Sequence, residues 1–221
     1  MTEIEIKHPL SVIDGTKIKL KDAFSWILHY YSQHKGTTQV SCVLDTTCSE
    51  MLMWNDNDKK EFVVQTNDIR PEIEADYHVC CSKLTSSTNR VFDMLIYDPP
   101  YIDLENRQDS EKYETAFNYG SMKELKDLEQ LTRQSSPCFW KLLNKNGVLI
   151  VKITNFHLDK QLHGSFDMIN WFSDYFYLFD EVIYRFFKHI PNLNWYKRKV
   201  AVTHSYFLIF KRKQVGGKKL W

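Results

Sequence analysis

The sequence is poor in several features that would settle its class at once. It has 221 residues but only seven glycines, and no apolar run approaches the roughly 18 residues that a membrane-spanning helix requires. The first ten residues, MTEIEIKHPL, include two acids and lack the apolar core of a signal peptide. These absences predict a protein of the cytoplasm or the nucleus that does not cross a membrane.

Cysteine is also sparse, and its spacing is uninformative. Five cysteines occur, an odd number, and no two of them form a CxxC pair: Cys42, Cys48, Cys80, Cys81 and Cys138. A disulfide framework or a zinc site would show paired, regularly spaced cysteines. We therefore expect reduced thiols and no bound metal.

Acidic residues are absent from the last 37 residues. Residues 185–221 hold ten lysines and arginines without an acid, whereas the rest of the chain holds 19 basic and 28 acidic residues. The formal net charge of +1 hides this asymmetry. A polyanion such as a nucleic acid is the partner that a basic end suits. The alternative is a solvated basic tail, which leaves no functional signal.

Strand-like and helix-like segments alternate along the chain. The patterns predict helices at 22–34, 122–143 and 161–177, with a further short helix within 70–79. They predict strands at 40–45, 61–68, near 80, and at 91–98, 147–154, 180–187 and 204–212. Asn146-Gly147 is typical of a helix stop after the second helix. We predict a single α/β domain with a doubly wound, mostly parallel, seven-stranded sheet and a C-terminal antiparallel hairpin at its edge.

The segment LIYDPPYID at 95–103 holds the strongest motif. Four apolar residues, Met94 and the first three of this segment, run into Asp98, Pro99, Pro100 and Tyr101. Prolines end a central strand because they lack the N–H that the ladder needs. Asp45 and Asp68 also follow expected strands. Ligands of such sheets bind beyond the carboxyl ends of the strands, so the three acids predict a site at that edge.

Asp98-Pro99-Pro100-Tyr101 resembles the signature of class I S-adenosylmethionine-dependent methyltransferases that modify adenine N6 or cytosine N4 in nucleic acids. The resemblance extends over residues 40–211 and implies a Rossmann-like fold with S-adenosyl-L-methionine as cofactor. It implies that Asp98 and Pro99 accept the hydrogens of an exocyclic amine, that Pro100 stiffens the turn, and that Tyr101 stacks on an extruded base. No metal is needed for this chemistry.

The resemblance also implies a cofactor site. Its residues would be Asp45, Thr46, Thr47, Cys48, Asp68, Ile69, Cys80 and Asp98. Asp68 would bind the ribose hydroxyls, although a capping aspartate is the alternative, and Cys80 would lie beside the adenine unless it is a core thiol. The loop after Asp45, TTCSE, contains none of the glycines that relatives place there. That departure favours a catalytically silent subunit with the same fold.

Two polar segments remain. Residues 102–121 form a long Tyr-rich loop that would serve as a lid over the target base. Residues 187–203 interleave aromatic side chains with cations, which suits a splayed nucleic-acid strand: Lys188, Trp195, Tyr196, Lys197, Arg198 and Lys199. A hairpin connection packed on the sheet is the alternative. Residues 1–38 would form a helical N-terminal extension.

The motifs support three functions, which follow in order of decreasing support. The first is methylation of an exocyclic amine in nucleic acid, with adenine N6 in DNA ahead of RNA. The second is the same chemistry on RNA. The third is a silent methyltransferase-fold subunit that binds nucleic acid or a catalytic partner. No obvious target-recognition domain is present, so sequence specificity would be low or would come from a protein partner.

Overall fold

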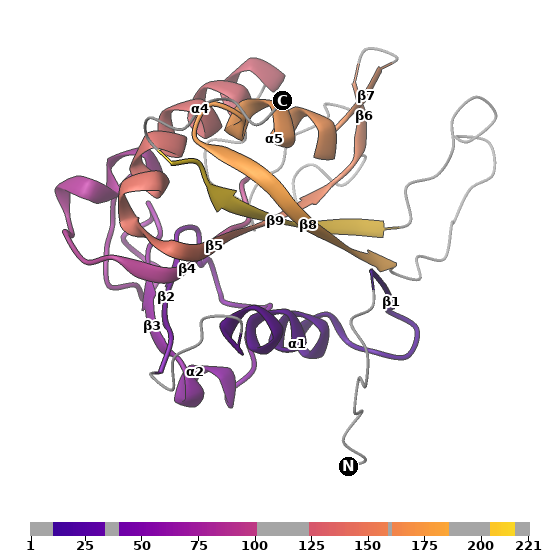
Figure 1. Ribbon diagram of the computed structural model, residues 1–221, viewed down its shortest axis with the longest axis horizontal. Coiled ribbons are helices and arrows are strands. Elements are labelled where there is room, and N and C mark those ends of the chain that lie inside the picture. The colour runs from indigo at the N-terminus through magenta and orange to yellow at the C-terminus, as the bar shows by residue number, and fades with distance from the viewer. Residues whose placement is uncertain (1–10, 34–39, 101–123, 159–160, 186–203, 215–221) are drawn as a thin grey trace.

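The computed structural model describes residues 11–33, 40–100, 124–158, 161–185 and 204–214. Seven of the strands described there form one twisted sheet. Helix α1 covers one face of this sheet, and helices α4 and α5 cover the other (Figure 1). This three-layer arrangement buries both faces of the central strands, as a largely parallel sheet requires.

The sheet has the order β1-β8-β9-β5-β4-β2-β3. Its strands are β1 (Val12–Asp14), β2 (Cys42–Asp45), β3 (Val63–Thr66), β4 (Phe92–Tyr97), β5 (Leu143–Thr154), β8 (Phe176–Arg185) and β9 (His204–Arg212). Only β9 runs antiparallel to its neighbours, β5 and β8. The predicted fold class and the antiparallel C-terminal pair are therefore confirmed. The sequence did not indicate β1, which pairs with β8 in parallel beyond that pair.

The helices differ from the sequence-based expectations in two places. They are α1 (Leu20–Gln33), α2 (Asp58–Glu61), the 3-10 helix η1 (Cys81–Ser86), α4 (Leu125–Leu142) and α5 (Ser165–Phe172). Residues 70–79 form turns in place of the expected short helix, and the expected strand near Cys80 is reduced to one bridge between Asn67 and Tyr77. α5 is shorter than the predicted 161–177 because the small hairpin of β6 (Phe156–Leu158) and β7 (Gln161–His163) precedes it and β8 follows closely.

Asn146-Gly147 does not end a helix. α4 ends at Leu142 and β5 begins at Leu143, so the pair lies inside a strand. The pairing of β4 with β5 shifts register between Phe92 and Met94 beside it. A Cβ at Gly147 would approach the carbonyl oxygen of Asp93 to 2.6 Å. The glycine is therefore needed for close backbone contact at an irregularity in the sheet.

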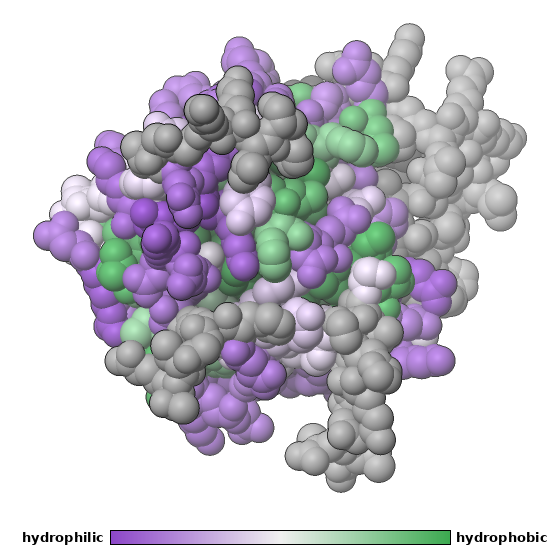
Figure 2. All heavy atoms as spheres, viewed as in Figure 1, coloured by the Kyte–Doolittle hydropathy of each residue, from purple (hydrophilic) through white to green (hydrophobic). Residues whose placement is uncertain are grey.

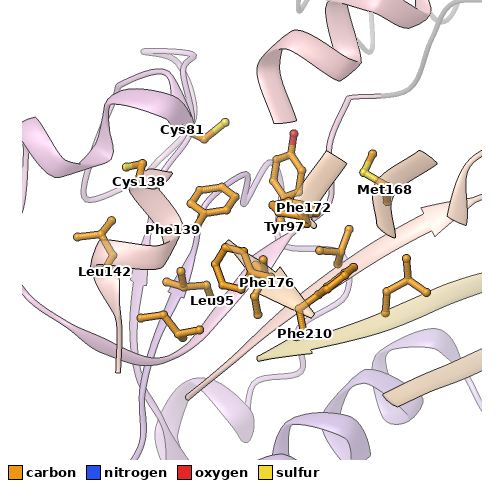
Figure 3. Close-up of a cluster of buried hydrophobic side chains, with 14 of the residues drawn as sticks. Cys81, Leu95, Tyr97, Cys138, Phe139, Leu142, Met168, Phe172, Phe176 and Phe210 are labelled. Atoms are coloured by element: carbon orange, nitrogen blue, oxygen red, sulfur yellow. The ribbon is translucent and has the colours of Figure 1, made fainter. Parts of the chain in front are cut away.

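Aromatic side chains fill the layer between the sheet and α4 and α5 (Figure 3). The ring of Tyr97 on β4 packs edge-on against Phe139 of α4 with centroids 5.3 Å apart, and Phe172 of α5 lies 5.3 Å from Phe210 of β9. On the opposite face Phe24 of α1 contacts Trp54 and Phe207. Close packing on both faces fixes the carboxyl ends of β2, β4 and β5, where the predicted site lies.

The outer surface is mostly polar. Hydrophilic side chains predominate on the face drawn in Figure 2, with smaller hydrophobic areas between them. Among the helices that the structure describes, none has both the length and the apolar character needed to cross a membrane.

Candidate active site

The acids predicted from the strand ends lie at one edge of the sheet. β2 pairs with both β3 and β4 in parallel, so Asp45 at the end of β2 has Asp68 on one side and Asp98 on the other. Successive side chains of a strand point to opposite faces. Val43 and Ile96 pack on the α1 face, so Asp45 and Asp98, two residues further along, belong to that face too.

Asp98 begins the Asp-Pro-Pro turn directly after β4. Its backbone N–H donates to the Thr47 hydroxyl at 3.0 Å, which joins the turn to the loop after β2. The Lys152 ammonium donates to Oδ2 of Asp98 at 2.9 Å. Oδ1 is buried, and it has no hydrogen-bond partner among the residues that the structure describes. Pro99 is buried and Pro100 half-buried, so the turn is held on both sides.

The sequence interpretation did not include Lys152. Tyr97 of β4 pairs with Val151 of β5, which brings Lys152 alongside Asp98. The side chain is 11% exposed, and lysines are rarely so buried unless they are paired. The available signal was the lone cation inside the apolar strand GVLIVKIT at 147–154.

Asp45 is fully engaged inside the protein. The indole N–H of Trp54 donates to its Oδ2 at 2.7 Å, and the backbone N–H of Thr47 donates to its Oδ1 at 3.2 Å. Burial raises the pKa of Asp45 to about 7, and the charges of Asp98 and Asp68 act in the same direction, against the lowering effect of the two hydrogen bonds. Asp45 therefore organises the loop and carries a proton in much of the population near neutral pH.

The glycine-free loop after β2 still adopts backbone shapes that glycine favours. Ser49 and Met51 have φ values of 47° and 53°, in the left-handed region. The hydroxyl of the buried Thr46 donates to the carbonyl of Ile96 at 2.7 Å, and the N–H of the buried Cys48 donates to the carbonyl of Asn67 at 2.9 Å. The loop is thus tied to β4 and to the segment after β3.

Asp68 has its four acceptor positions filled. The guanidinium and backbone N–H of Arg70 donate three hydrogen bonds to the carboxylate at 3.0–3.2 Å. The backbone N–H of Ser49 donates the fourth at 3.0 Å. A carboxylate offers about four lone-pair sites. Ribose hydroxyls would therefore have to displace Arg70 from Asp68.

Ile69 and Cys80 lie at the same edge with accessible side chains. Ile69 is 59% exposed, which is unusual for an isoleucine at the rim of a core. Cys80 is half-buried at the start of η1, with its sulfur 3.1 Å from the Ser82 hydroxyl. Hydrogen bonds from the side chain of Cys81 and from Ser82 lower the pKa of Cys80 to about 5. Both side chains offer contact surface beside the loop.

Other predicted site residues lie outside the described residues. They are Tyr101 with the expected lid at 102–121, and the basic aromatic residues Lys188, Trp195, Tyr196, Lys197, Arg198 and Lys199. The site described here therefore consists of the loop after β2, the Asp68 segment, the Asp-Pro-Pro turn and Lys152.

Comparisons with known proteins identify the fold. No family model and no curated protein matches the sequence. Among solved structures, the N-methyltransferase NodS from Bradyrhizobium japonicum, in complex with S-adenosyl-L-homocysteine, superimposes with a TM-score of 0.51 at 12% identity, over 88% of this chain and 87% of NodS. A second NodS structure superimposes with a TM-score of 0.50 at 12% identity, over 88% of this chain and 96% of NodS. An S-adenosylmethionine-dependent methyltransferase from Clostridium acetobutylicum superimposes with a TM-score of 0.47 at 12% identity, over 88% of this chain and 92% of that protein. The two NodS superpositions show that the chain has the fold of S-adenosylmethionine-dependent methyltransferases.

Proposed function

We propose that the protein is an S-adenosylmethionine-dependent methyltransferase that acts on the exocyclic amine of a nucleic-acid base, with adenine N6 in DNA as the first substrate. The observation that carries this proposal is the buried, unpartnered Oδ1 of Asp98. A buried acceptor without a partner is costly, and it is explained when a ligand supplies the donor. Here the acceptor stands in an Asp-Pro-Pro turn at the ligand-binding edge of a methyltransferase fold.

The residues at this edge fit the cofactor. The exposed Ile69 would pack on the adenine ring, and Asp68 would accept the ribose hydroxyls once they displace Arg70. The backbone N–H groups of Thr46, Thr47, Cys48 and Ser49 already donate within the protein, so they fix the loop itself. When bound, the cofactor supplies a methyl group on a sulfonium, which is a good leaving group.

The chain itself contributes positioning. The lone pair of an exocyclic amine is delocalised into the ring, so the nitrogen attacks poorly. Oδ1 of Asp98 and the Pro99 carbonyl would accept its hydrogens and turn the lone pair towards the methyl group. The prolines hold these acceptors still, and near-attack geometry of this kind lowers barriers by up to about 7–11 kcal/mol in favourable model reactions. The proton released by the product then passes to solvent.

Nucleic acid as substrate is supported by the sequence of residues 187–199. Aromatic residues that alternate with lysines and arginines suit an unstacked strand. Charge reversal of Lys197, Arg198 and Lys199 should therefore weaken binding of a single-stranded oligonucleotide and flatten its salt dependence. Binding with unchanged affinity and salt slope would contradict this assignment.

Methyl transfer from labelled cofactor tests the function. Wild type should label adenine-containing DNA, and Asp98→Ala should lower kcat by at least about 10²-fold, because it removes the oxygen that accepts the amine hydrogens. Cofactor binding should be largely retained. Asp174→Ala changes an exposed aspartate away from the site and should keep full activity. Turnover by Asp98→Ala at the wild-type rate would contradict the assignment.

The saturated Asp68 favours a second candidate, a silent methyltransferase-fold subunit. The two candidates differ in what Arg70→Ala does to calorimetric binding of S-adenosylmethionine. If Arg70 only occupies the ribose acceptor, the variant should bind the cofactor several-fold more tightly than wild type, whereas Asp68→Ala should bind more weakly. A chain that binds no cofactor in any of the three forms would be the silent subunit.

A further inference from the structure

Lys152 is a single buried cation in an otherwise apolar strand. Its neighbours in β5, Ile150 and Val151, are fully buried, and its own side chain is 11% exposed. Ile150 packs on the α1 face, so Lys152 projects to that face beyond it, as Asp98 does beyond Ile96. The ammonium group thus meets the Asp98 carboxylate across the β4–β5 pair at 2.9 Å.

Stability alone does not explain this pair. Transfer of two charges out of water costs as much as their attraction returns, and apolar residues of similar size commonly serve a fold as well. The pair also leaves Oδ1 of Asp98 without a partner, which a purely structural pair would satisfy. A buried pair that orients one carboxylate oxygen and leaves the other open is an arrangement for binding a donor.

The surrounding charges show why a cation is needed there. The titratable groups around Asp98 among the described residues are Asp45 on β2, Lys152 on β5 and Tyr97 within β4, and Asp68 acts on Asp45 from the next segment. Neighbouring carboxylates resist joint ionisation. Burial raises the pKa of Asp45 to about 7. The Lys152 ammonium, 2.9 Å from Oδ2, is the cation that the structure places against the Asp98 carboxylate.

We propose that Lys152 is a positioning residue for the methyl transfer, which anchors Oδ2 of Asp98 and leaves Oδ1 to accept an N–H of the target amine. This inference rests on the proposed function, because the amine is the donor that Oδ1 awaits. The charge-assisted hydrogen bond of 2.9 Å restricts rotation of the carboxylate, so Oδ1 keeps one direction at the edge of the sheet. Lys152 therefore sets the orientation of the catalytic carboxylate.

Enzyme kinetics provide the first test. Lys152→Met removes the charge at similar length, Lys152→Gln keeps a hydrogen-bond donor without the charge, and Lys152→Arg keeps the charge. Met and Gln should lower kcat by about 10²-fold at neutral pH, with KM for the nucleic acid and cofactor affinity unchanged. Arg should restore most of the rate. Lys145→Met, an exposed site at the other end of β5, is the matched control.

A spectroscopic measurement decides the inference even without activity. The ¹³C resonance of the Asp98 carboxyl, assigned by its loss in Asp98→Asn, should shift at neutral pH in Lys152→Gln and Lys152→Met and stay near the wild-type position in Lys152→Arg. Coinciding resonances in all four proteins, or a wild-type kcat in Lys152→Gln, would overturn the role of Lys152. If the resonances separate but wild type methylates no base amine, the proposed function fails while the positioning of Asp98 by Lys152 stands.

Discussion

Three carboxylates lie at one edge of the sheet, and their different hydrogen-bond partners indicate different roles. Each oxygen of Asp45 accepts one hydrogen bond, the four acceptor positions of Asp68 are filled by Arg70 and Ser49, and of the three only Asp98 keeps a buried oxygen open. The sequence predicted the three positions because each acid follows an apolar strand. It did not predict their partners, because Trp54, Arg70 and Lys152 meet the acids only through loop geometry and strand register.

The titration of Asp45 has a measurable effect on stability. Its pKa is raised to about 7 in the native state, against about 3.9 in an unfolded chain. Between these values the native state binds a proton that the unfolded chain has released, so this group's contribution to the free energy of unfolding falls as pH rises from about 4 to about 7. Burial of the charged carboxylate is the cause.

Comparison of wild type with Asp45→Asn isolates this contribution. The free energy of unfolding of wild type minus that of the variant should fall by about 2–3 kcal/mol between pH 5 and pH 8. Urea denaturation at a series of pH values measures it, and other titrating groups cancel in the difference. A difference that is constant with pH, or that rises, would show that Asp45 is ionised throughout.

At the scale of elements, the loop after β2 shows how the chain manages without glycine. Ser49 and Met51 take left-handed backbone conformations, and Asp68 fixes the loop by accepting the Ser49 N–H. The sequence analysis interpreted the missing glycines as a departure from the family pattern. A sequence pattern indicates where glycine would be easy, but it does not show whether neighbouring hydrogen bonds stabilise the same conformation in another residue.

Substitution at Ser49 tests whether the left-handed backbone conformation in the loop after β2 lowers stability. Ser49→Gly should raise the free energy of unfolding by about 0.5–1 kcal/mol, because glycine reaches φ of 47° without the Cβ clash. Ser49→Thr keeps the hydroxyl that accepts from Arg70 but adds a β-branch, and should lower stability by a similar amount. Equal stability of all three proteins would show that the loop is unstrained.

At Gly147 the local sequence predicted the end of a helix, but the residue lies inside strand β5. Asn-Gly after a helical pattern is a common stop signal, but the helix had already ended and the glycine serves the contact with Asp93 in β4. Gly147→Ala should therefore lower the free energy of unfolding by about 1–3 kcal/mol. Lys145→Ala, two residues earlier and exposed, should change stability little and serves as the comparison in thermal denaturation.

For the molecule as a whole, alternation of strands and helices was enough to predict the sheet, its mostly parallel pairing and its antiparallel C-terminal pair. β1 was missed because three residues carry too little periodicity, and its place beside β8 depends on pairing over more than 160 positions of sequence. The register of β4 against β5, over 54 positions of sequence, likewise brings Lys152 to Asp98. Functional residues at strand ends can thus be predicted from the local sequence pattern. Contacts between side chains of neighbouring strands depend on the assembled fold.

The most direct test of the central claim is to identify the methylated atom. DNA and RNA oligonucleotides that contain adenine are incubated with the protein and S-adenosylmethionine, digested to nucleosides and analysed by mass spectrometry, with matched oligonucleotides in which purine replaces adenine. Methylation on the exocyclic nitrogen of adenine, absent with purine and with Asp98→Ala, is the predicted result. A methyl group on a ring nitrogen or a ribose oxygen, or equal methylation of the purine oligonucleotide, would contradict it.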